Sequence, residues 1–356
     1  MKELVDFKEE IHRCSRCGIC QGVCPIYQAT GNDCSVSRGQ FVMLKGILDG
    51  KLTLSKTVNR YLDLCLKCGK CTSACPSGVN PVDVIIAAKY EYFKSHPIEK
   101  LISFIQKYFI FGLGVKILSY FNRRTKSKKF DKKVLYFGGC GSKVKGDKTI
   151  VQILNSIGIE VINPKYHCCG IYMLTRGDLK GFNNYIKSFV EITQKYGINE
   201  IVTNCVSCEK TLKDYIRWAE DKDIKEFLKG IKIKNIYEYL KENNLQLSLK
   251  KTTKVTYHKP CHLENFDDVK WILNNTKNLE YVEMPEYDSC CGLNGITKIR
   301  EYNTMKKVFN KKYKNILSTN VKYILTSCVG CEAALTLYSK GKYRVYDLLQ
   351  FIQTRL

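Results

Sequence analysis

The cysteines constrain the fold of this chain more than any other feature. Among its 356 residues are 19 cysteines, and 18 of them form two runs of four followed by two sets of five. The first ten residues are charged and lack the apolar stretch of a signal peptide, which predicts a cytoplasmic protein. Disulfide frameworks are rare in that reducing compartment, so this cysteine content indicates metal binding or redox chemistry.

Each run of four has the spacing C-x-x-C-x-x-C-x-x-x-C-P. The runs are Cys14, Cys17, Cys20 and Cys24 before Pro25, and Cys65, Cys68, Cys71 and Cys75 before Pro76. This is the spacing of bacterial two-cluster ferredoxins, in which three thiolates of a run hold one [4Fe-4S] cluster and the fourth crosses to the other. The predicted ligand sets are therefore Cys14, Cys17, Cys20 and Cys75 for one cluster, and Cys65, Cys68, Cys71 and Cys24 for the other. Structural zinc is the alternative, and it fits poorly because zinc sites use two separated pairs of cysteines.

Residues beyond 130 form a tandem repeat. The first unit contains Cys140, Cys168, Cys169, Cys205 and Cys208, and the second contains Cys261, Cys290, Cys291, Cys328 and Cys331. Corresponding cysteines lie 121 to 123 positions apart, so the register between the units hardly changes. This regularity indicates a duplication.

Each unit alternates short apolar runs with stretches of helical periodicity. In the first unit this pattern predicts strands at residues 134–137, 160–162 and 200–203, and helices at 149–157 and 182–196. Such alternation favours a parallel sheet covered by helices, with ligands bound beyond the carboxyl ends of the strands. The five cysteines of each unit follow those ends, so we expect them to converge near helix N-termini, which favour thiolates.

These patterns together predict the domain organisation. An α-helical ferredoxin domain with two [4Fe-4S] clusters is expected over residues 1–95, and a basic linker helix over 96–130. A duplicated α/β cysteine-rich domain with parallel strands follows, over residues 131–245 and 250–356.

Five cysteines in one set exceed the four that a cubane needs. Either one thiol is spare for redox chemistry, or a noncubane cluster uses all five; a zinc site with four of them and a redox disulfide are the alternatives. Gly170 and Gly292 follow the adjacent pairs and let the backbone approach closely. His167, His258 and His262 lie beside these cysteines and could donate hydrogen bonds to sulfur, carry protons, replace a ligand, or only satisfy backbone groups.

The charge balance narrows the choice of partners. There are 58 Lys and Arg against 34 Asp and Glu, a net charge of +24 spread along the whole chain. Part of this excess offsets the negative charge of thiolate-bound clusters, and the rest suits an acidic protein or an anionic membrane surface. Nucleic acid is not an expected partner, because the sequence has no base-reading helix and no basic run with interleaved aromatics. The sequence also lacks a G-x-G-x-x-G fingerprint after a strand and a phosphate loop, so a flavin is expected on a separate partner.

Two further features stay ambiguous in the sequence. Residues 101–121 are apolar and precede a basic stretch, but Lys107 and Lys116 interrupt them and two glycines weaken any helix. The alternatives are a segment that lies on an anionic membrane or a partner, and a linker helix packed on its own protein. Cys34 lies outside all the sets and is predicted to be a buried thiol that acts as a small hydrophobe.

The motifs carry a family resemblance that extends from residue 14 to residue 331. Two ferredoxin runs followed by two Cys-Cys-Gly units resemble the iron–sulfur subunits of flavin-dependent 2-hydroxy-acid dehydrogenases, such as glycolate oxidase and lactate-utilisation proteins. A related subunit occurs in anaerobic glycerol-3-phosphate dehydrogenase. The local stretches at residues 24–27, 37–40 and 75–79 favour the 2-hydroxy-acid group. The resemblance implies two [4Fe-4S] clusters, with a further iron–sulfur cluster or zinc in each cysteine-rich domain.

The same resemblance implies partners and an alternative function. A separate FAD-containing dehydrogenase subunit would oxidise a 2-hydroxy acid, and this chain would pass the electrons to a quinone or another carrier, at the inner face of the membrane. The Cys-Cys-Gly units also look like those of the catalytic heterodisulfide reductase subunit. Many glycolate oxidase subunits keep a single cysteine where this chain has the pairs Cys205 with Cys208 and Cys328 with Cys331. Disulfide reduction at noncubane clusters therefore stays an alternative, and a zinc-stabilised interaction protein is a second.

Overall fold

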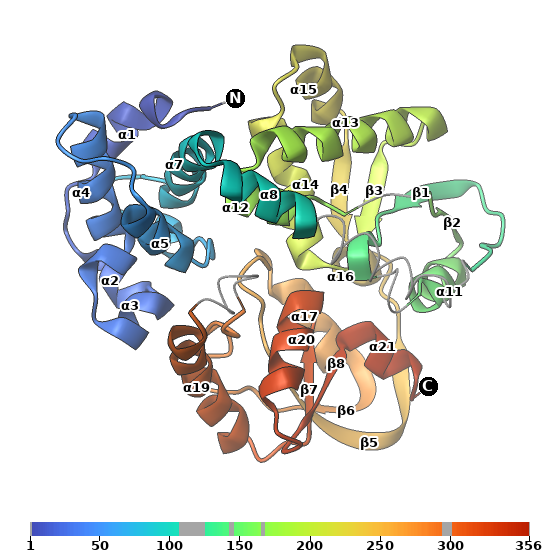
Figure 1. Cartoon of the computed structure of the whole chain (residues 1–356). Helices are drawn as coiled ribbons and strands as arrows, with labels where there is room; N and C mark the ends of the chain where they lie inside the picture. The colour runs from blue at the N-terminus through green and yellow to red at the C-terminus, as the bar shows by residue number, and fades with distance from the viewer. Residues whose placement is uncertain (1, 107–124, 142–145, 165–167, 294–300, 356) are drawn as a thin grey trace. The chain divides into compact units, whose positions relative to one another are not determined.

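The computed structural model describes residues 2–106, 125–141, 146–164, 168–293 and 301–355. The chain divides into two compact units (Figure 1). Unit 1 joins Met1–Phe104 to two distant segments, Tyr172–Gly181 and Ser289–Lys314. Unit 2 contains Ile105–Ile171, Phe182–Asp288 and Asn315–Leu356. The residues around each Cys-Cys pair are therefore where the chain changes from one unit to the other.

Unit 1 is built from helices, which confirms the predicted helical ferredoxin domain. Its N-terminal elements are η1(Leu4–Phe7), α1(Lys8–Arg13), α2(Ile19–Val23), α3(Pro25–Thr30), η2(Asp33–Ser35), α4(Ser37–Leu48), α5(Lys56–Leu64), α6(Lys70–Ser73), α7(Pro81–Ser95) and α8(Pro97–Gln106). The prolines are placed as helix starters: Pro25 and Pro81 occupy the first turns of α3 and α7, where a missing N–H costs nothing. The Ser55 hydroxyl caps α5 by accepting a hydrogen bond from the Val58 N–H at 3.3 Å.

Two distant segments also belong to unit 1: Tyr172–Gly181 follows the first Cys-Cys pair, and Ser289–Lys314 contains the second. The first contains most of α12(Ile171–Arg176), and the second contains most of α19(Tyr302–Ser318). In the second segment, the Glu301 carboxylate accepts a hydrogen bond from the Arg60 guanidinium at 2.5 Å. This joining of segments far apart in the sequence was not predicted.

Unit 2 contains two four-stranded sheets in which every described strand pair is parallel. The first sheet has the order β2-β1-β3-β4 and the second β6-β5-β7-β8. The strands are β1(Lys132–Tyr136), β2(Ile159–Ile162), β3(Glu200–Thr203), β4(Lys232–Asn235), β5(Leu247–Tyr257), β6(Thr276–Tyr281), β7(Tyr323–Thr326) and β8(Arg344–Asp347). The identical order confirms the duplicated α/β domain. Strands β4 and β8, each at one edge of its sheet, were not predicted because they are short and polar, as exposed sheet edges often are.

Helices flank each sheet of unit 2 (Figure 1). They are α11(Lys148–Ser156), α13(Leu179–Tyr196), α14(Val206–Trp218), α15(Lys222–Lys229) and α16(Ile236–Glu242) in the first repeat, and α17(Asp267–Asn275), α20(Val329–Tyr338) and α21(Leu348–Gln353) in the second. The repeats contact each other within unit 2: Lys241 of α16 and Asp268 of α17 form an ion pair at 2.8 Å. The Val206 N–H also donates a hydrogen bond to the Ser327 carbonyl at 3.2 Å. The starts of α14 and α20 therefore lie side by side.

The expected linker helix is described only in part. Residues 97–106 form α8, and residues 107–124, which include most of the apolar stretch, lie outside the described residues. Within the described ranges, no helix has both the length and the apolar character needed to cross a bilayer.

Candidate metal centres

The two cysteine runs of unit 1 adopt the same backbone conformation. The residue before the second cysteine has a left-handed conformation in both, with φ of 58° at Arg16 and 51° at Lys67. The residue after it is a glycine with positive φ, 85° at Gly18 and 76° at Gly69, and each glycine caps the helix that carries the third cysteine. At the wider angles of Gly18 and Gly69 a side chain would be strained, so glycine suits these two positions. These turns point three thiols of each run in one direction.

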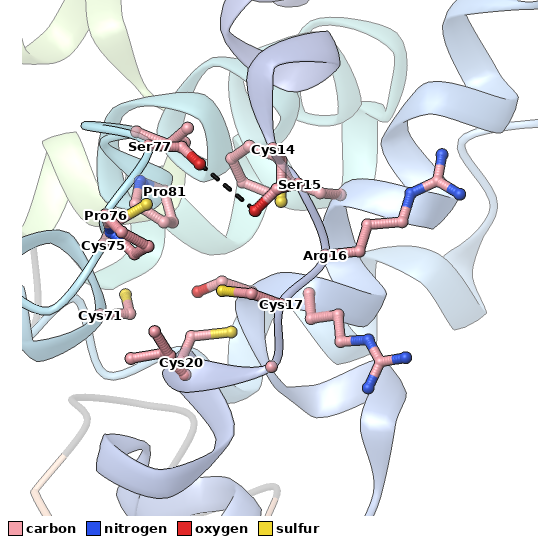
Figure 2. A pocket seen from close by; sticks show the side chains of 16 residues that line it. Cys14, Ser15, Arg16, Cys17, Cys20, Cys71, Cys75, Pro76, Ser77 and Pro81 are labelled. Atoms are coloured by element: carbon pink, nitrogen blue, oxygen red, sulfur yellow. Dashed lines mark hydrogen bonds between the residues drawn. The ribbon is translucent and has the colours of Figure 1, made fainter.

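The first run lines a pocket of about 420 Å³ (Figure 2). Cys14, Cys17, Cys20 and Cys75 lie around it, and these are the members of the first predicted ligand set. The Ser77 hydroxyl donates a hydrogen bond to the Ser15 hydroxyl at 3.3 Å across the rim. Cys75 thus reaches this pocket from the other run, and Cys17 is exposed.

The second run lines a pocket of about 370 Å³, similar in size to the first. Cys65, Cys68 and Cys71 lie around it together with Cys24, the last cysteine of the first run. Cys71 also lines the first pocket. The structure thus brings together the members of each predicted set, with the fourth cysteines crossing over.

The electrostatics of these thiols suit a bound cationic centre. Burial, together with the nearby Cys65, raises the pKa of Cys24 to about 12. Burial likewise raises the pKa of Cys71 to about 12, with Cys65 again adding to the effect. Several thiolates crowded in a buried pocket are unfavourable without positive charge among them. Iron supplies that charge, and the four cysteines of each predicted set match the ligand count of a [4Fe-4S] cluster.

In unit 2, the five cysteines of the first set follow the carboxyl ends of β1, β2 and β3, as predicted. Their thiols form a hydrogen-bonded chain that runs Cys140, Cys168, Cys169, Cys208, Cys205. The hydrogen bond from the Cys168 thiol, followed by that from Cys208, lowers the pKa of Cys169 to about 5. The Tyr215 hydroxyl donates a hydrogen bond to the Cys169 carbonyl at 2.9 Å and so holds the pair in place.

The chain of thiols continues into the second repeat. Cys205 contacts Cys328, and Cys328 contacts Cys331, so cysteines of both sets touch within unit 2. The hydrogen bonds from Cys205 and Cys331 hold the pKa of Cys328 well below its ordinary value. The Ser207 hydroxyl lies 3.3 Å from the Cys328 sulfur and 2.9 Å from Nδ1 of His262. Ser207 of the first repeat thus lies between His262 and a sulfur of the second repeat.

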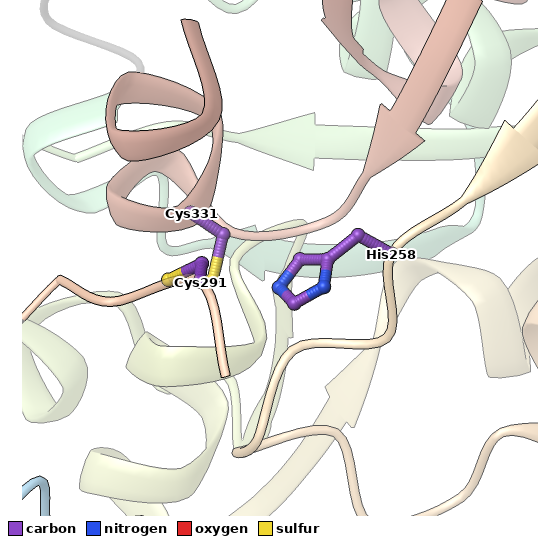
Figure 3. A group of neighbouring side chains, drawn as sticks. All are labelled: His258, Cys291 and Cys331. Carbon is purple, nitrogen blue, oxygen red and sulfur yellow. The ribbon is translucent and has the colours of Figure 1, made fainter. Parts of the chain in front are cut away.

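The remaining candidate residues are Cys261, His258 and His167. Cys261 follows β5 and is half-buried, and His258, which precedes it, is buried. Figure 3 shows the His258 imidazole facing the Cys331 thiol, and their possible ligand atoms lie within 4.8 Å of one another. His167 lies outside the described residues.

The Cys290–Cys291 pair belongs to unit 1, as part of Ser289–Lys314. Cys290 is buried there in an apolar cluster with Ile26, Leu64, Met305 and Val308, and Cys24 packs against the same cluster. A cysteine of the second set of five therefore shares a core with a cysteine of the ferredoxin runs. The sequence offered no signal for this neighbourhood.

Cys34 departs from its prediction. It is half-buried and not buried, because it lies in the short turn η2 at the surface. The Asn32 side chain accepts a hydrogen bond from the Cys34 N–H at 2.9 Å, which orders the turn without involving the thiol.

A buried ion network in unit 1 was also missed. The Lys89 ammonium, 5% exposed, pairs with the Asp63 carboxylate and lies 3.4 Å from Oδ1 of Asn59. Burial alone would raise the pKa of Asp63, but Lys89 and Lys67 outweigh it, so the pKa lies below its ordinary value. Burial lowers the pKa of Lys67 to about 8, and Lys89 adds to that effect. A lysine inside a helical pattern gives no sign that it will be buried.

Replacing Lys89 tests how much this network contributes to stability. Lys89→Met leaves the half-buried Asp63 carboxylate without its main partner, which is expected to lower the free energy of unfolding by about 3 kcal/mol. The matched control is Lys94→Met on the same helix, because Lys94 pairs with Glu3 at an exposed site and is expected to contribute less than about 1 kcal/mol. Anaerobic urea denaturation measures both, and equal losses would contradict the expectation.

Comparisons with known proteins agree with this arrangement. Residues 10–79 match the model of a 4Fe-4S dicluster domain, and residues 134–213 and 255–336 each match the model of a cysteine-rich domain. The chain is 25% identical to the probable glycolate oxidase iron–sulfur subunit of Bacillus subtilis, over 93% of this chain and 91% of that protein. It is also 25% identical to a subunit of the dihydromethanophenazine:CoB–CoM heterodisulfide reductase of Methanosarcina acetivorans, over 92% of this chain and 88% of that protein.

One solved structure shares the fold. A hypothetical protein from Helicobacter pylori superimposes with a TM-score of 0.55 at 14% identity, covering 89% of this chain and 67% of that one. At this identity the likeness concerns the fold alone.

Proposed function

We propose that this chain is an electron-transfer subunit of a flavin-dependent 2-hydroxy-acid dehydrogenase. The chain belongs to the iron–sulfur proteins that join a 4Fe-4S dicluster domain to two cysteine-rich domains. A separate FAD-containing subunit oxidises glycolate or lactate. This chain collects the electrons singly and passes them to a quinone or another carrier. The relative from Bacillus subtilis, named as a glycolate oxidase iron–sulfur subunit and aligned over nearly the whole chain, supports this choice.

The observation that carries the proposal is the grouping of cysteines in unit 1. Two pockets gather these thiols, with Cys24 and Cys75 crossing between the runs: Cys14, Cys17, Cys20, Cys71 and Cys75 line the first, and Cys24, Cys65, Cys68 and Cys71 line the second. We propose that Cys14, Cys17, Cys20 and Cys75 bind one [4Fe-4S] cluster and that Cys65, Cys68, Cys71 and Cys24 bind the other. When bound, such clusters supply one-electron chemistry. The chain's own contribution is to hold them in separate pockets that share one wall at Cys71.

The cysteine-rich domains are proposed to hold a further iron–sulfur centre in each set of five. Cys140, Cys168, Cys169, Cys205 and Cys208 would bind one, and Cys261, Cys290, Cys291, Cys328 and Cys331 the other. The contact between Cys205 and Cys328 supports a short path from one set to the other. We propose a cytoplasmic location at the inner face of the membrane, for which the net charge of +24 is the support, since anionic lipid headgroups attract basic proteins.

A specific observation favours a second candidate function, the reduction of a disulfide. Both sets of five are complete, and seven of their cysteines form one continuous hydrogen-bonded chain within unit 2. A relative named as part of a heterodisulfide reductase aligns over 92% of this chain. In this function the cysteine-rich domains reduce a disulfide with electrons taken from the two ferredoxin-type clusters.

One anaerobic preparation distinguishes these functions. The isolated chain is expected to contain iron and acid-labile sulfide, to show reducible clusters by electron paramagnetic resonance, and to leave glycolate and lactate unoxidised. Adding an FAD-containing glycolate or lactate dehydrogenase subunit should let its substrate reduce the clusters. Reduction of the CoM–CoB heterodisulfide by the isolated chain with reduced viologen would instead favour the second function. A preparation that contains zinc and no acid-labile sulfide would rule out both and indicate a zinc-stabilised interaction protein.

A further inference from the structure

The two pockets of unit 1 differ in how far their linings reach the surface. Five residues that line the first pocket are exposed: Ser15, Arg16, Cys17, Ile19 and Pro76. Among the described residues that line the second pocket, none is exposed. Unit 1 itself supplies part of that cover, because Ile26 lines the second pocket and is buried in the apolar cluster with Leu64. The first pocket is therefore the one that a partner protein can approach.

Two arginines supply the charge in the lining of the first pocket. Arg16 is exposed, and Figure 2 shows its side chain pointing away from the pocket. The Arg38 guanidinium lies beside the turn that carries Cys17, since a Cβ atom on Gly18 would be 3.8 Å from it. This guanidinium also donates a hydrogen bond to Oε1 of Gln21 at 3.5 Å. Both positive groups thus lie at the mouth of the pocket.

The charges of these arginines are not neutralised within the part of the chain that the structure describes. Neither Arg16 nor Arg38 forms an ion pair with a carboxylate there. The carboxylate of Asp33 instead accepts a hydrogen bond from the Gln21 amide. Solvent screens an exposed charge that points away from the pocket, so Arg16 offsets little of the negative charge of a bound cluster. Its guanidinium is placed to meet a carboxylate of another protein.

Exposed apolar side chains lie next to these charges. Ile19 begins α2, lines the first pocket and is 47% exposed. Val42 is 48% exposed and follows Arg38 by one helical turn on α4, and α2 and α4 contact each other. Transient interfaces between redox proteins are small and combine apolar contacts with a polar, charged rim. Arg16, Ile19, Arg38 and Val42 together form what we call the docking patch.

We propose that the docking patch binds the protein that exchanges electrons with the first cluster, and that this partner presents carboxylates around its own redox group. This inference rests on the proposed electron-transfer function. One electron passes between the two proteins, and no bond is made or broken. An anionic membrane would offer similar charges, but the patch adjoins Cys17, a proposed cluster ligand. That position favours a partner that carries electrons, and lipid headgroups carry none.

Binding of an acidic electron carrier tests the proposal. The probe is oxidised plant-type ferredoxin, which has a negatively charged surface, and the protein is the intact, anaerobically loaded chain. Isothermal titration calorimetry at about 0.01 M salt, where charges act over about 30 Å, measures the Kd without electron transfer. Arg16→Glu is expected to raise this Kd about tenfold, because it replaces an attraction by a repulsion. At about 1 M salt the difference should disappear, since charges then act over only about 3 Å.

Lys51→Glu is the matched control, because it changes the net charge by the same amount. Lys51 is exposed and lies beyond the far end of α4, which extends about 15 Å from Arg38. Its replacement is expected to change the Kd less than about twofold. Stopped-flow kinetics adds a second control: reduced ferredoxin should reduce Arg16→Glu about tenfold more slowly than wild type. Reduced viologen, a small cation, should reduce Arg16→Glu at least as fast.

The outcomes separate this proposal from the proposed function. In proteins with full iron content, an equal Kd in wild type and Arg16→Glu, an equal rise in Arg16→Glu and Lys51→Glu, or no measurable binding of ferredoxin would overturn the docking patch. If Arg16→Glu then releases the chain from vesicles that contain phosphatidylglycerol, the patch contacts a membrane instead. If Arg16→Glu loses iron, Arg16→Gln replaces it, with an expected rise of about threefold. A chain that binds no [4Fe-4S] cluster would refute the proposed function itself.

Discussion

Cys24→Ala is expected to remove the cluster of the second cysteine run, although Cys24 lies in the first. Cys24 lines the second pocket with Cys65, Cys68 and Cys71, so its loss leaves that cluster with three ligands. Iron and acid-labile sulfide should fall by the content of one cluster, and electron transfer through the chain should be almost abolished. The measurement is anaerobic iron and sulfide analysis together with electron paramagnetic resonance of the reduced protein.

The crossing of ligands is tested by comparing residual spectra. The spectrum of Cys24→Ala should match that of Cys65→Ala and differ from that of Cys14→Ala. The opposite match would show that each run binds its own cluster with all four of its cysteines. Cys34→Ala is the control, because this half-buried cysteine lies outside both pockets and its loss should change neither the iron content nor the spectra.

Gly177→Ala is expected to destabilise unit 1 by about 4 kcal/mol, since it combines backbone strain with a steric clash. Gly177 has φ of 85°, and a Cβ atom there would lie 2.4 Å from the carbonyl carbon of Lys89 and 2.5 Å from its oxygen. These are backbone atoms of α7, which cannot move aside as a flexible side chain can. The segment Tyr172–Gly181 must therefore separate from α7 or shift it, and the Arg176–Glu99 ion pair is expected to be lost with it.

The effect of the clash is isolated by a second glycine. Gly197 also has positive φ, 62°, but a Cβ atom there would meet nothing within 4 Å. Gly197→Ala should cost only the backbone strain, about 1 to 2 kcal/mol. Urea denaturation of both variants gives the comparison, and hydrogen exchange along α7 reports whether the segment has separated. Similar losses of stability in the two variants would mean that Gly177 is required for its backbone conformation alone.

Strands and helices were predicted correctly where the pattern of neighbouring residues determines them. The strand over residues 200–203 coincides with β3, and the predicted helix at 149–157 differs from α11 by one residue at each end. Alternating apolar and helical patterns were sufficient because each strand and helix must bury one face wherever it packs. Edge strands β4 and β8 were missed, since a strand that is half-exposed needs no apolar run.

For the candidate sites too, features set by sequence spacing were predicted, and contacts set by tertiary packing were not. The spacing of each cysteine run leaves its first three thiols few conformations in which to converge, and the ferredoxin pattern assigns the fourth, Cys24 or Cys75, to the other group. The contact of Cys205 with Cys328 could not, because it depends on how two repeats pack. The same holds for the apolar cluster that contains Cys290 and against which Cys24 packs, since these cysteines lie 266 positions apart in the sequence.

The cysteine sets, the duplication and the parallel sheets follow from the amino-acid order alone, because short-range spacing and periodicity restrict the backbone directly. Two other features depend on the folded chain: Tyr172–Gly181 and Ser289–Lys314 belong with the helical unit, and Lys67 is buried while its counterpart Arg16 is exposed. The physical reason is that burial is a property of the assembled core. Whether a charge or a thiol is removed from water depends on apolar surfaces supplied by segments that are distant in the chain.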